Sequence, residues 1–233
     1  MAFAKERLAG GRAASAGPAV AASAVSSGAV GAPAPAAASP ETSALPAAEC
    51  LRRGAFALGQ GQFQKALGLY ESASAQDPAS ADARLGRAES LRGLGRFAEA
   101  VSAFDEAMAA GTSAASAWVG KAAALEGLGR FLDAVASYDE AIRREPQNLL
   151  PRNGRGWALL QGARPAEALA AFEEVLSADP RFALARFGKG CAEDQLGRGA
   201  LAALSYQQFL ALSPPHLTAQ ITHARSRLSA LRP

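Results

Sequence analysis

Apolar residues recur at helical spacing along most of the chain. In the stretch 115–148, Trp118, Ala122 and Leu125 form an i, i+4, i+7 stripe that predicts a first helix. After a glycine-containing turn, a second apolar stripe follows, made of Phe131, Ala134, Val135, Tyr138, Ala141 and Ile142. Pro146 ends this second helix, because proline lacks a backbone N–H and disfavours helical geometry in the residue before it. The stretch is therefore predicted to fold as a helical hairpin.

The same pattern returns every 34 residues in one register. The motif GLGRF stands at 93–97 and again at 127–131, and the same shift links the prolines that close four of the five units. Five predicted helix pairs follow: 47–80, 81–114, 115–148, 149–182 and 183–214. Apolar residues at helical spacing in 215–233 predict one more helix, which caps the stack with a polar outer face.

Small residues and rings keep fixed places in this register. Positions 8 and 20 of every unit hold Gly or Ala, which lets the two helices of a pair approach closely. Position 24 holds a ring in all five units, and we expect these rings in the core: Tyr70, Phe104, Tyr138, Phe172 and Tyr206.

The third unit shows the full set of residues at family positions: Trp118, Ala122, Leu125, Gly129, Phe131, Ala134, Tyr138, Ala141 and Pro146. In this respect the chain resembles a tetratricopeptide-repeat (TPR) protein over 47–214. The resemblance implies an all-α fold, a right-handed superhelical solenoid of five helix pairs plus the capping helix. It also implies that the first helices of the pairs line a concave groove that binds a partner.

The resemblance places positions 2, 5, 9 and 12 of each first helix in the groove, and the candidate residues come from positions 5, 9 and 12. Most of these residues are apolar, which suits an amphipathic helix or an extended segment with hydrophobic anchors. Relatives that hold a chaperone's C-terminal carboxylate use Lys and Asn at positions 5 and 9 of the first repeat, where this chain has Leu51 and Ala55. The predicted partner-binding residues are Leu51, Leu85, Glu89, Val119, Glu126, Asn153, Trp157, Leu160, Phe187 and Asp194.

Among these, the hydrophobic anchors are expected to be Leu85, Val119, Trp157, Leu160 and Phe187. The alternative is that neighbouring repeats or the tail of the chain bury several of them.

Position 6 is glycine in four successive units, inside predicted helices: Gly86, Gly120, Gly154 and Gly188. Each costs about 1 kcal/mol relative to alanine in a helix interior. One interpretation is that the glycines form a groove floor that a partner backbone approaches, so that Gly→Ala changes stabilise the fold and weaken binding. The other is that helix packing or a compositional bias explains them.

The first 46 residues differ from the rest in composition. Thirty of residues 1–40 are Ala, Gly, Ser or Pro, which cannot bury enough apolar surface to offset the entropy of ordering, so 1–46 is predicted to be disordered. We expect a cytoplasmic protein, or an organelle-imported or exported one if this segment is a targeting peptide. The sequence contains no apolar run long enough to predict a transmembrane segment.

Charge and candidate chemistry point away from nucleic acid and catalysis. The net charge of +3 comes with a nearly neutral repeat region, and the arginines of 215–233 are interpreted as solvation of the cap, so nucleic-acid binding is not favoured. His216 and His223 have no acid in their helix, and His223 is expected on the surface. Cys50 and Cys191 lie four units apart with no histidine in their own helix pairs. We predict no catalytic residue, metal site or cofactor.

The sequence therefore predicts a non-enzymatic scaffold or adaptor that binds a protein or peptide ligand in its groove and assists complex assembly. Two alternatives stay open. One is a structural protein that self-associates into homo-oligomers through exposed apolar repeat faces. The other is a regulatory module of an enzyme complex.

Overall fold

The computed structural model describes residues 45–231, and this part of the chain consists of helices joined by short turns. The first segment, 1–44, for which disorder is predicted, lies outside the described residues. The helices are α1 (Ala47–Gly59), α2 (Phe63–Gln76), α3 (Ala81–Gly93), α4 (Phe97–Ala109), α5 (Ala115–Gly127), α6 (Phe131–Arg144), α7 (Leu149–Gln161), α8 (Pro165–Ala178), α9 (Ala183–Gln195), α10 (Gly199–Leu212) and α11 (Thr218–Ala230).

The turn inside each helix pair is set at position 15 of the unit, where the backbone is left-handed. Glycine supplies this conformation in four units, with φ between 70° and 74°, at Gly61, Gly95, Gly129 and Gly197. The fourth unit has Ala163 there instead, with φ of 58°. Because a Cβ disfavours this region, the sequence selects glycine at this turn, and Ala163 is strained.

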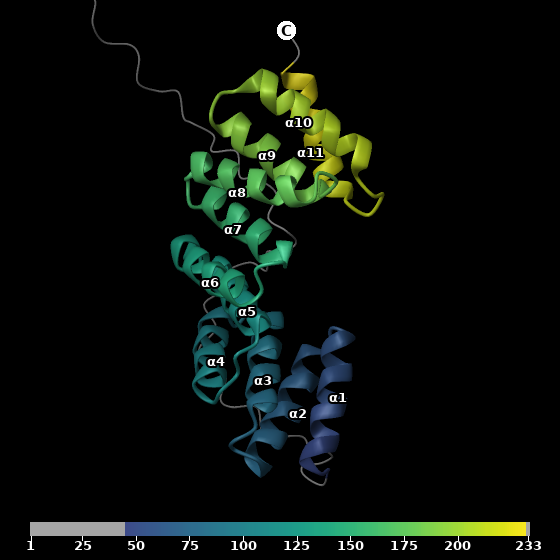
Figure 1. Ribbon diagram of the computed structural model, residues 1–233. Helices are drawn as coiled ribbons and strands as arrows, with labels where there is room; N and C mark the ends of the chain where they lie inside the picture. The colour runs from purple at the N-terminus through teal and green to yellow at the C-terminus, as the bar shows by residue number, and fades with distance from the viewer. Residues whose placement is uncertain (1–44, 232–233) are drawn as a thin grey trace, which may run out of the picture.

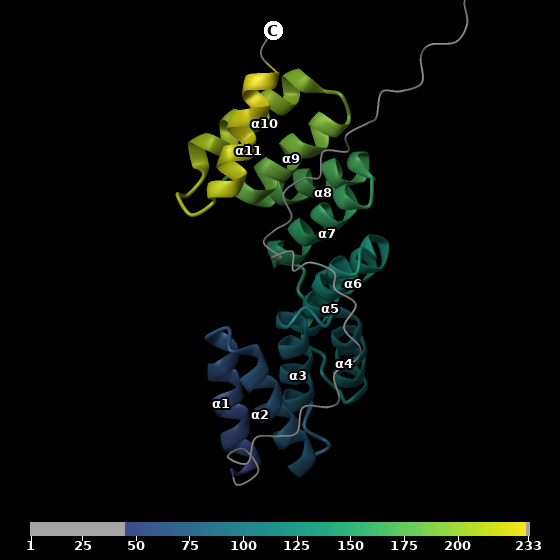
Figure 2. The ribbon, with the colours of Figure 1, turned by 180° about the vertical axis from the view of Figure 1, so that it is seen from behind.

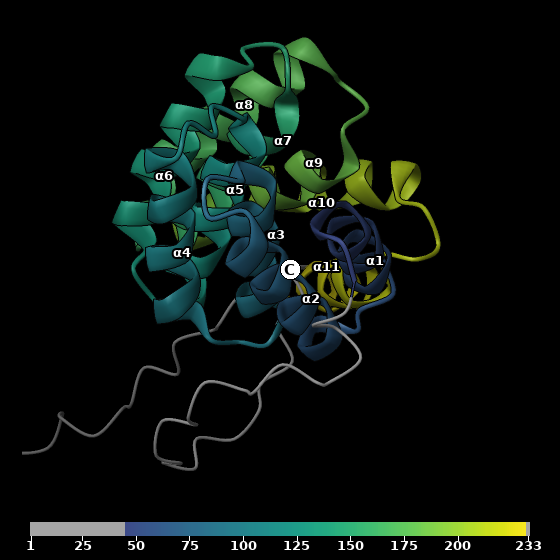
Figure 3. The same ribbon diagram turned by 90° about the horizontal axis from the view of Figure 1, so that it is seen from below.

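Each helix packs against the one before it and the one after it, so the chain forms a solenoid. The array rises from α1 at one end to α10 and α11 at the other (Figure 1). Seen from below, α4, α6 and α8 form an outer layer, whereas α3, α5 and α7 lie nearer the centre (Figure 3). The path turns clockwise as it recedes from α1, which makes the superhelix right-handed. The predicted all-α solenoid is confirmed.

The ring at position 24 of every unit is buried, as predicted. Each ring fills space between its own unit and the next one, because the facing residues are small. Tyr70, for example, lies close to both Gly54 of its own unit and Gly86 of the next. Alanine and glycine on the first helices thus leave room for one ring at each junction.

Ion pairs on the surface repeat with the same period. A base at position 7 of one unit meets an acid at position 25 of the preceding unit. The three pairs are Lys121–Asp105 at 2.6 Å, Arg155–Asp139 at 3.2 Å and Lys189–Glu173 at 2.8 Å. Since at least one partner in each is well exposed, each contributes at most about 1 kcal/mol, and they serve mainly to fix the register between units.

The last helix, α11, closes the array beside α10 (Figures 1 and 2). An apolar stripe on and beside it packs on the core that contains the fifth unit: Ala224 is fully buried, and Leu217, Ile221, Leu228 and Leu231 are partly buried. Arg225 is exposed, as expected of a polar outer face. Arg227 and His223 instead turn towards α9, so the expectation that both are solvated surface residues was wrong. Arg232 lies outside the described residues.

Candidate functional site

The predicted groove residues stand on the first helices of the pairs, α1, α3, α5, α7 and α9. We call positions 5, 9 and 12 of these helices the inner face. The first three units keep this face partly open: Leu51, Leu85, Glu89, Val119 and Glu126 all retain some exposure. In units four and five the residues at these positions are buried, except for Asp194, which is partly exposed.

Trp157 and Phe187 form part of an internal aromatic cluster. Phe187 is 0% exposed and lies 5.1 to 6.0 Å, between ring centroids, from Trp157, Tyr206, Phe209 and His223. Trp157, 8% exposed, also packs edge-on against Phe172 at 5.4 Å. Leu160 is 5% exposed in the same core. The prediction that these three residues anchor a partner was wrong, because all three are buried in the core that units four and five share.

Two contacts fix α11 on this cluster. The His223 ring lies perpendicular to Phe187, and burial, together with the Arg227 charge, lowers the pKa of His223. Arg227 donates from Nε and Nη2 to the two carboxylate oxygens of Asp194, at 2.6 and 2.8 Å. The predicted groove residue Asp194 is therefore held by the chain's own last helix.

The position-6 glycines face the interior. A Cβ at Gly86, Gly120, Gly154 or Gly188 would lie 2.2 to 2.6 Å from the position-24 ring of the preceding unit. Each glycine thus makes room for that ring, which supports the packing interpretation. The glycines are not an open groove floor, and because an added Cβ would collide with a ring, Gly→Ala changes are expected to destabilise the fold rather than stabilise it.

Glu126 carries the most perturbed carboxyl on the inner face. Burial raises its pKa to about 7, and a hydrogen bond from the Tyr138 hydroxyl offsets part of that rise. Its Oε1 atom is buried and accepts no hydrogen bond. Asn153, 8% exposed, likewise has a buried Oδ1 without a partner. These two side chains leave hydrogen-bond acceptors unused on the inner face, which is costly in a folded protein.

Glu89, one unit earlier, is in a different state. Its Oε2 accepts from Nε and Nη2 of Arg92, at 2.9 and 2.7 Å, so this acid is paired within α3. The inner face of the first three units therefore combines partly exposed aliphatic side chains with one paired and one unpaired carboxyl.

Neither cysteine is an activated nucleophile. Burial raises the pKa of Cys191 to about 12, so its thiol stays protonated near neutral pH. Cys50 is buried and donates to the carbonyl oxygen of Leu45 at 3.6 Å. Within residues 45–231 no cluster of three or more His, Cys, Asp or Glu side chains could hold a metal ion. The described residues also include no helix that is both long and apolar enough to span a bilayer.

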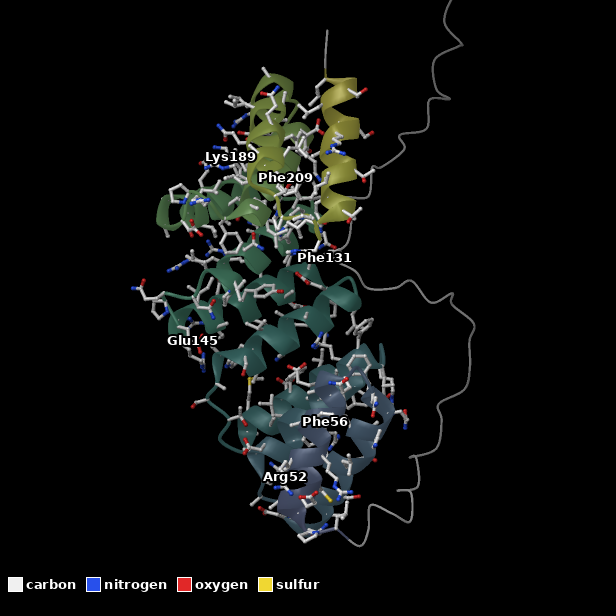
Figure 4. The ribbon with its side chains drawn as sticks, turned by 90° about the vertical axis from the view of Figure 1, so that its right-hand side faces the viewer. Arg52, Phe56, Phe131, Glu145, Lys189 and Phe209 are labelled. Carbon is white, nitrogen blue, oxygen red and sulfur yellow. The ribbon has the colours of Figure 1, made fainter. Side chains whose placement is uncertain are left out.

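The face of α1 that begins the array is open. Positions 3, 6 and 10 of later units hold small, mostly buried residues that pack on the unit before, but α1 has Glu49, Arg52 and Phe56. Phe56 is 70% exposed, and Glu49 pairs with both Arg52 and Arg53. Figure 4 shows Arg52 and Phe56 on α1, at the end of the array away from α11. Among the described residues no earlier unit covers these positions, so charged and aromatic side chains stand where later units have small ones.

Comparison with known proteins agrees with this architecture. Models of the tetratricopeptide repeat match residues 57–125, 115–148 and 153–216. These matches span most of the solenoid, and the chain belongs to the tetratricopeptide-repeat family. A comparison with curated proteins gives no match.

Several solved TPR structures share the fold. YrrB, described as a TPR protein with an unusual peptide-binding site, is 20% identical, with a TM-score of 0.63 over 77% of this chain and 92% of that one. TTC0263, a TPR protein of Thermus thermophilus, is 20% identical, with a TM-score of 0.61 over 78% and 99%. MamA of Desulfovibrio magneticus RS-1 is 16% identical, with a TM-score of 0.66 over 71% and 94%. At these identities the likeness concerns the fold alone.

Proposed function

We propose that this protein is a non-enzymatic scaffold that binds a segment of a partner protein along the inner face of units one to three. The TPR fold supports a protein–protein interaction function. The observation that carries the finer proposal is the contrast along the inner face. Aliphatic side chains stay partly exposed at Leu51, Leu85 and Val119, whereas the corresponding positions of units four and five are buried.

The chemistry of this surface suits a peptide or an amphipathic helix with apolar anchors. Alternating aliphatic and charged side chains offer contact area together with fixed polar partners. The solenoid supplies rigidity, so little conformational entropy of the binding surface is lost on association. YrrB, which shares the fold, is described as having a peptide-binding site, and this likeness agrees with a peptide ligand here.

A photo-crosslinking residue introduced at Val119 tests this function. The variant is incubated with an extract of cells that naturally make the protein, and crosslinked partners are identified by mass spectrometry. A matched control carries the same residue at Leu132, which is 54% exposed on α6 next to the turn of the same unit. We expect a partner crosslinked at Val119 and not at Leu132. The same partner crosslinked equally at both positions would contradict an inner-face site.

Self-association is a second candidate, favoured by one specific feature. α10 contains no charged residue, and Leu201 and Leu204 expose about half of their surface on it. The other outer helices of the array carry acids or bases at several positions. Size-exclusion chromatography with light scattering, for wild type and a Leu201→Gln/Leu204→Gln variant, tests this candidate. A wild-type monomer at all concentrations would rule it out.

A further inference from the structure

An acid at position 12 and a tyrosine at position 24 occur together in two units. Unit five has Asp194 and Tyr206, and unit three has Glu126 and Tyr138. In both, the tyrosine hydroxyl hydrogen-bonds the carboxylate, with Tyr206 Oη 3.5 Å from an Asp194 oxygen. The two sites are built from the same positions of the repeat, so one serves as a structural template for the other.

The site in unit five is filled by an arginine. Arg227 of α11 donates to both carboxylate oxygens of Asp194, which is the bidentate geometry that a guanidinium and a carboxylate prefer. The hydrogen bond to Asp194 raises the pKa of Arg227. The carboxylate and the tyrosine hydroxyl of this unit therefore find their hydrogen-bond partners within the chain.

The site in unit three has the same acid and tyrosine, but no base is hydrogen-bonded to the acid. The residue that follows Glu126 by the same 33 positions as Arg227 follows Asp194 is Leu159, an apolar core residue. Arg92 on the preceding first helix acts on Tyr138 through its charge, but its guanidinium donates to Glu89. Glu126 Oε1 is left buried without a hydrogen-bond partner.

A second unpaired acceptor stands on the first helix of the next unit, α7. Asn153 is more than nine-tenths buried, and its Oδ1 has no hydrogen-bond partner. It precedes Gly154, and a Cβ at Gly154 would lie 2.9 Å from the hydroxyl oxygen of Tyr138, the group that bonds Glu126. Asn153 therefore stands on the helix that meets the Tyr138 hydroxyl, at the junction of units three and four, and its free acceptor is the second one on this part of the inner face.

We propose that Glu126, assisted by Asn153, receives a basic side chain of the bound partner, as Asp194 receives Arg227. The partner segment would then carry an arginine or lysine next to apolar residues that contact Leu85 and Val119. This inference rests on the proposed function, because it names the chemistry of the segment that the inner face binds. A segment with a cation that pairs with this acid should bind more tightly than a segment that leaves the acid unpaired in a partly buried site.

The test uses a displayed library of random twelve-residue peptides, panned against three full-length proteins. These are wild type, Glu126→Gln and the control Glu145→Gln, which removes the same charge from an exposed residue at the end of α6. Glutamine keeps the shape of Glu126 and removes a buried charge, so this variant is expected to fold at least as stably as wild type. Enriched peptides are then synthesised with the basic residue intact or replaced by citrulline, which is isosteric with arginine but uncharged.

We expect wild type and Glu145→Gln to enrich peptides with one fixed basic residue, and Glu126→Gln to bind them at least tenfold more weakly. Replacing that residue by citrulline should weaken binding to wild type and make little difference to Glu126→Gln. Enriched peptides without a shared basic residue, or an equal citrulline effect on both proteins, would overturn the inference.

A Leu85→Ser/Val119→Ser variant distinguishes a failure of the basic-residue site from a failure of the proposed inner-face function. Peptides that lose binding to this variant but not to Glu126→Gln would leave the inner-face function standing and the basic-residue site refuted. If wild type enriches no peptide, the proposed function fails and the inference fails with it.

Discussion

Single small residues decide how the units of this solenoid pack. Position 6 is glycine only where a preceding unit places a ring against it, and in the first unit, which has none, it is Arg52. The same difference is readable in the sequence, since the glycines always follow a unit with a ring at position 24. Glycine at these positions lowers the intrinsic stability of the helix but leaves room to bury a Tyr or Phe side chain.

Replacing Gly120 by alanine should destabilise the protein. The new Cβ would lie 2.4 Å from Phe104, so the ring and helix must separate, at a cost of about 1–3 kcal/mol that outweighs the roughly 1 kcal/mol gain in helix propensity. Gly68→Ala is the matched control, because a Cβ there meets no atom within 4 Å in the interior of α2. We expect urea unfolding to show lower stability for the first variant and higher stability for the second. Higher stability in both would contradict the packing account.

Glu126 should make stability depend on pH. Its folded pKa of about 7 lies above the ordinary value of 4.5, so the folded state binds its proton more tightly than the unfolded chain does. The free energy of unfolding therefore loses a contribution as pH rises from about 4.5 to above 7. Glu126→Gln removes this loss, and its stability relative to wild type should grow across that window, by at most about 3 kcal/mol. A constant difference between pH 4.5 and 8 in urea titrations would refute the buried-acid description.

At the scale of the helix pair, the turn at position 15 limits the stability of the fourth unit. Ala163 adopts φ of 58°, where its four counterparts are glycine. Ala163→Gly should raise the free energy of unfolding by about 0.5–1 kcal/mol, because the relief of strain exceeds the added entropy of the unfolded chain. Gly129→Ala, the reverse change in unit three, should lower it. Thermal unfolding followed by circular dichroism measures both, and a destabilised Ala163→Gly variant would contradict the assignment of strain.

The last helix depends on one partly buried ion pair for its position. Removing the guanidinium in Arg227→Ala leaves Asp194 with the Tyr206 hydroxyl alone and should speed amide hydrogen exchange in α11 and at the end of α9. Arg225→Ala removes an exposed arginine two positions earlier and serves as the control. Equal exchange rates in the two variants would show that α11 docks through its apolar stripe alone.

The helices, turns and ring positions were predictable because they depend on residues close in sequence and repeat with one period. The burial of Phe187 was not, because it depends in part on where α11 places His223. That placement is set by His223 and Arg227, which look like surface residues until the partner side chains on α9 are known. The unpaired state of Glu126 likewise depends on three helices, although the shared acid and tyrosine of units three and five were visible as a pattern.

Across the whole molecule, the two ends of the inner face have different tasks. Units four and five, with α11, bury their inner-face rings in one aromatic cluster, so this end of the array has a continuous core. Units one to three keep aliphatic side chains partly exposed on the same side, next to the half-buried Glu126, whose Oε1 has no hydrogen-bond partner. Each repeat unit of a solenoid contacts only its neighbours. Binding at one end of the array therefore need not disturb the packing at the other end.

Hydrogen exchange in the presence of a bound partner segment tests this division most directly. The probe is the tightest peptide from the displayed-library selection, added at saturating concentration to the full-length protein. The account predicts slower exchange in α3 and α5, with little change in the outer helices α8 and α10. Protection confined to α9, α10 and α11, or to the outer helices, would contradict a binding surface on the inner face of the first three units.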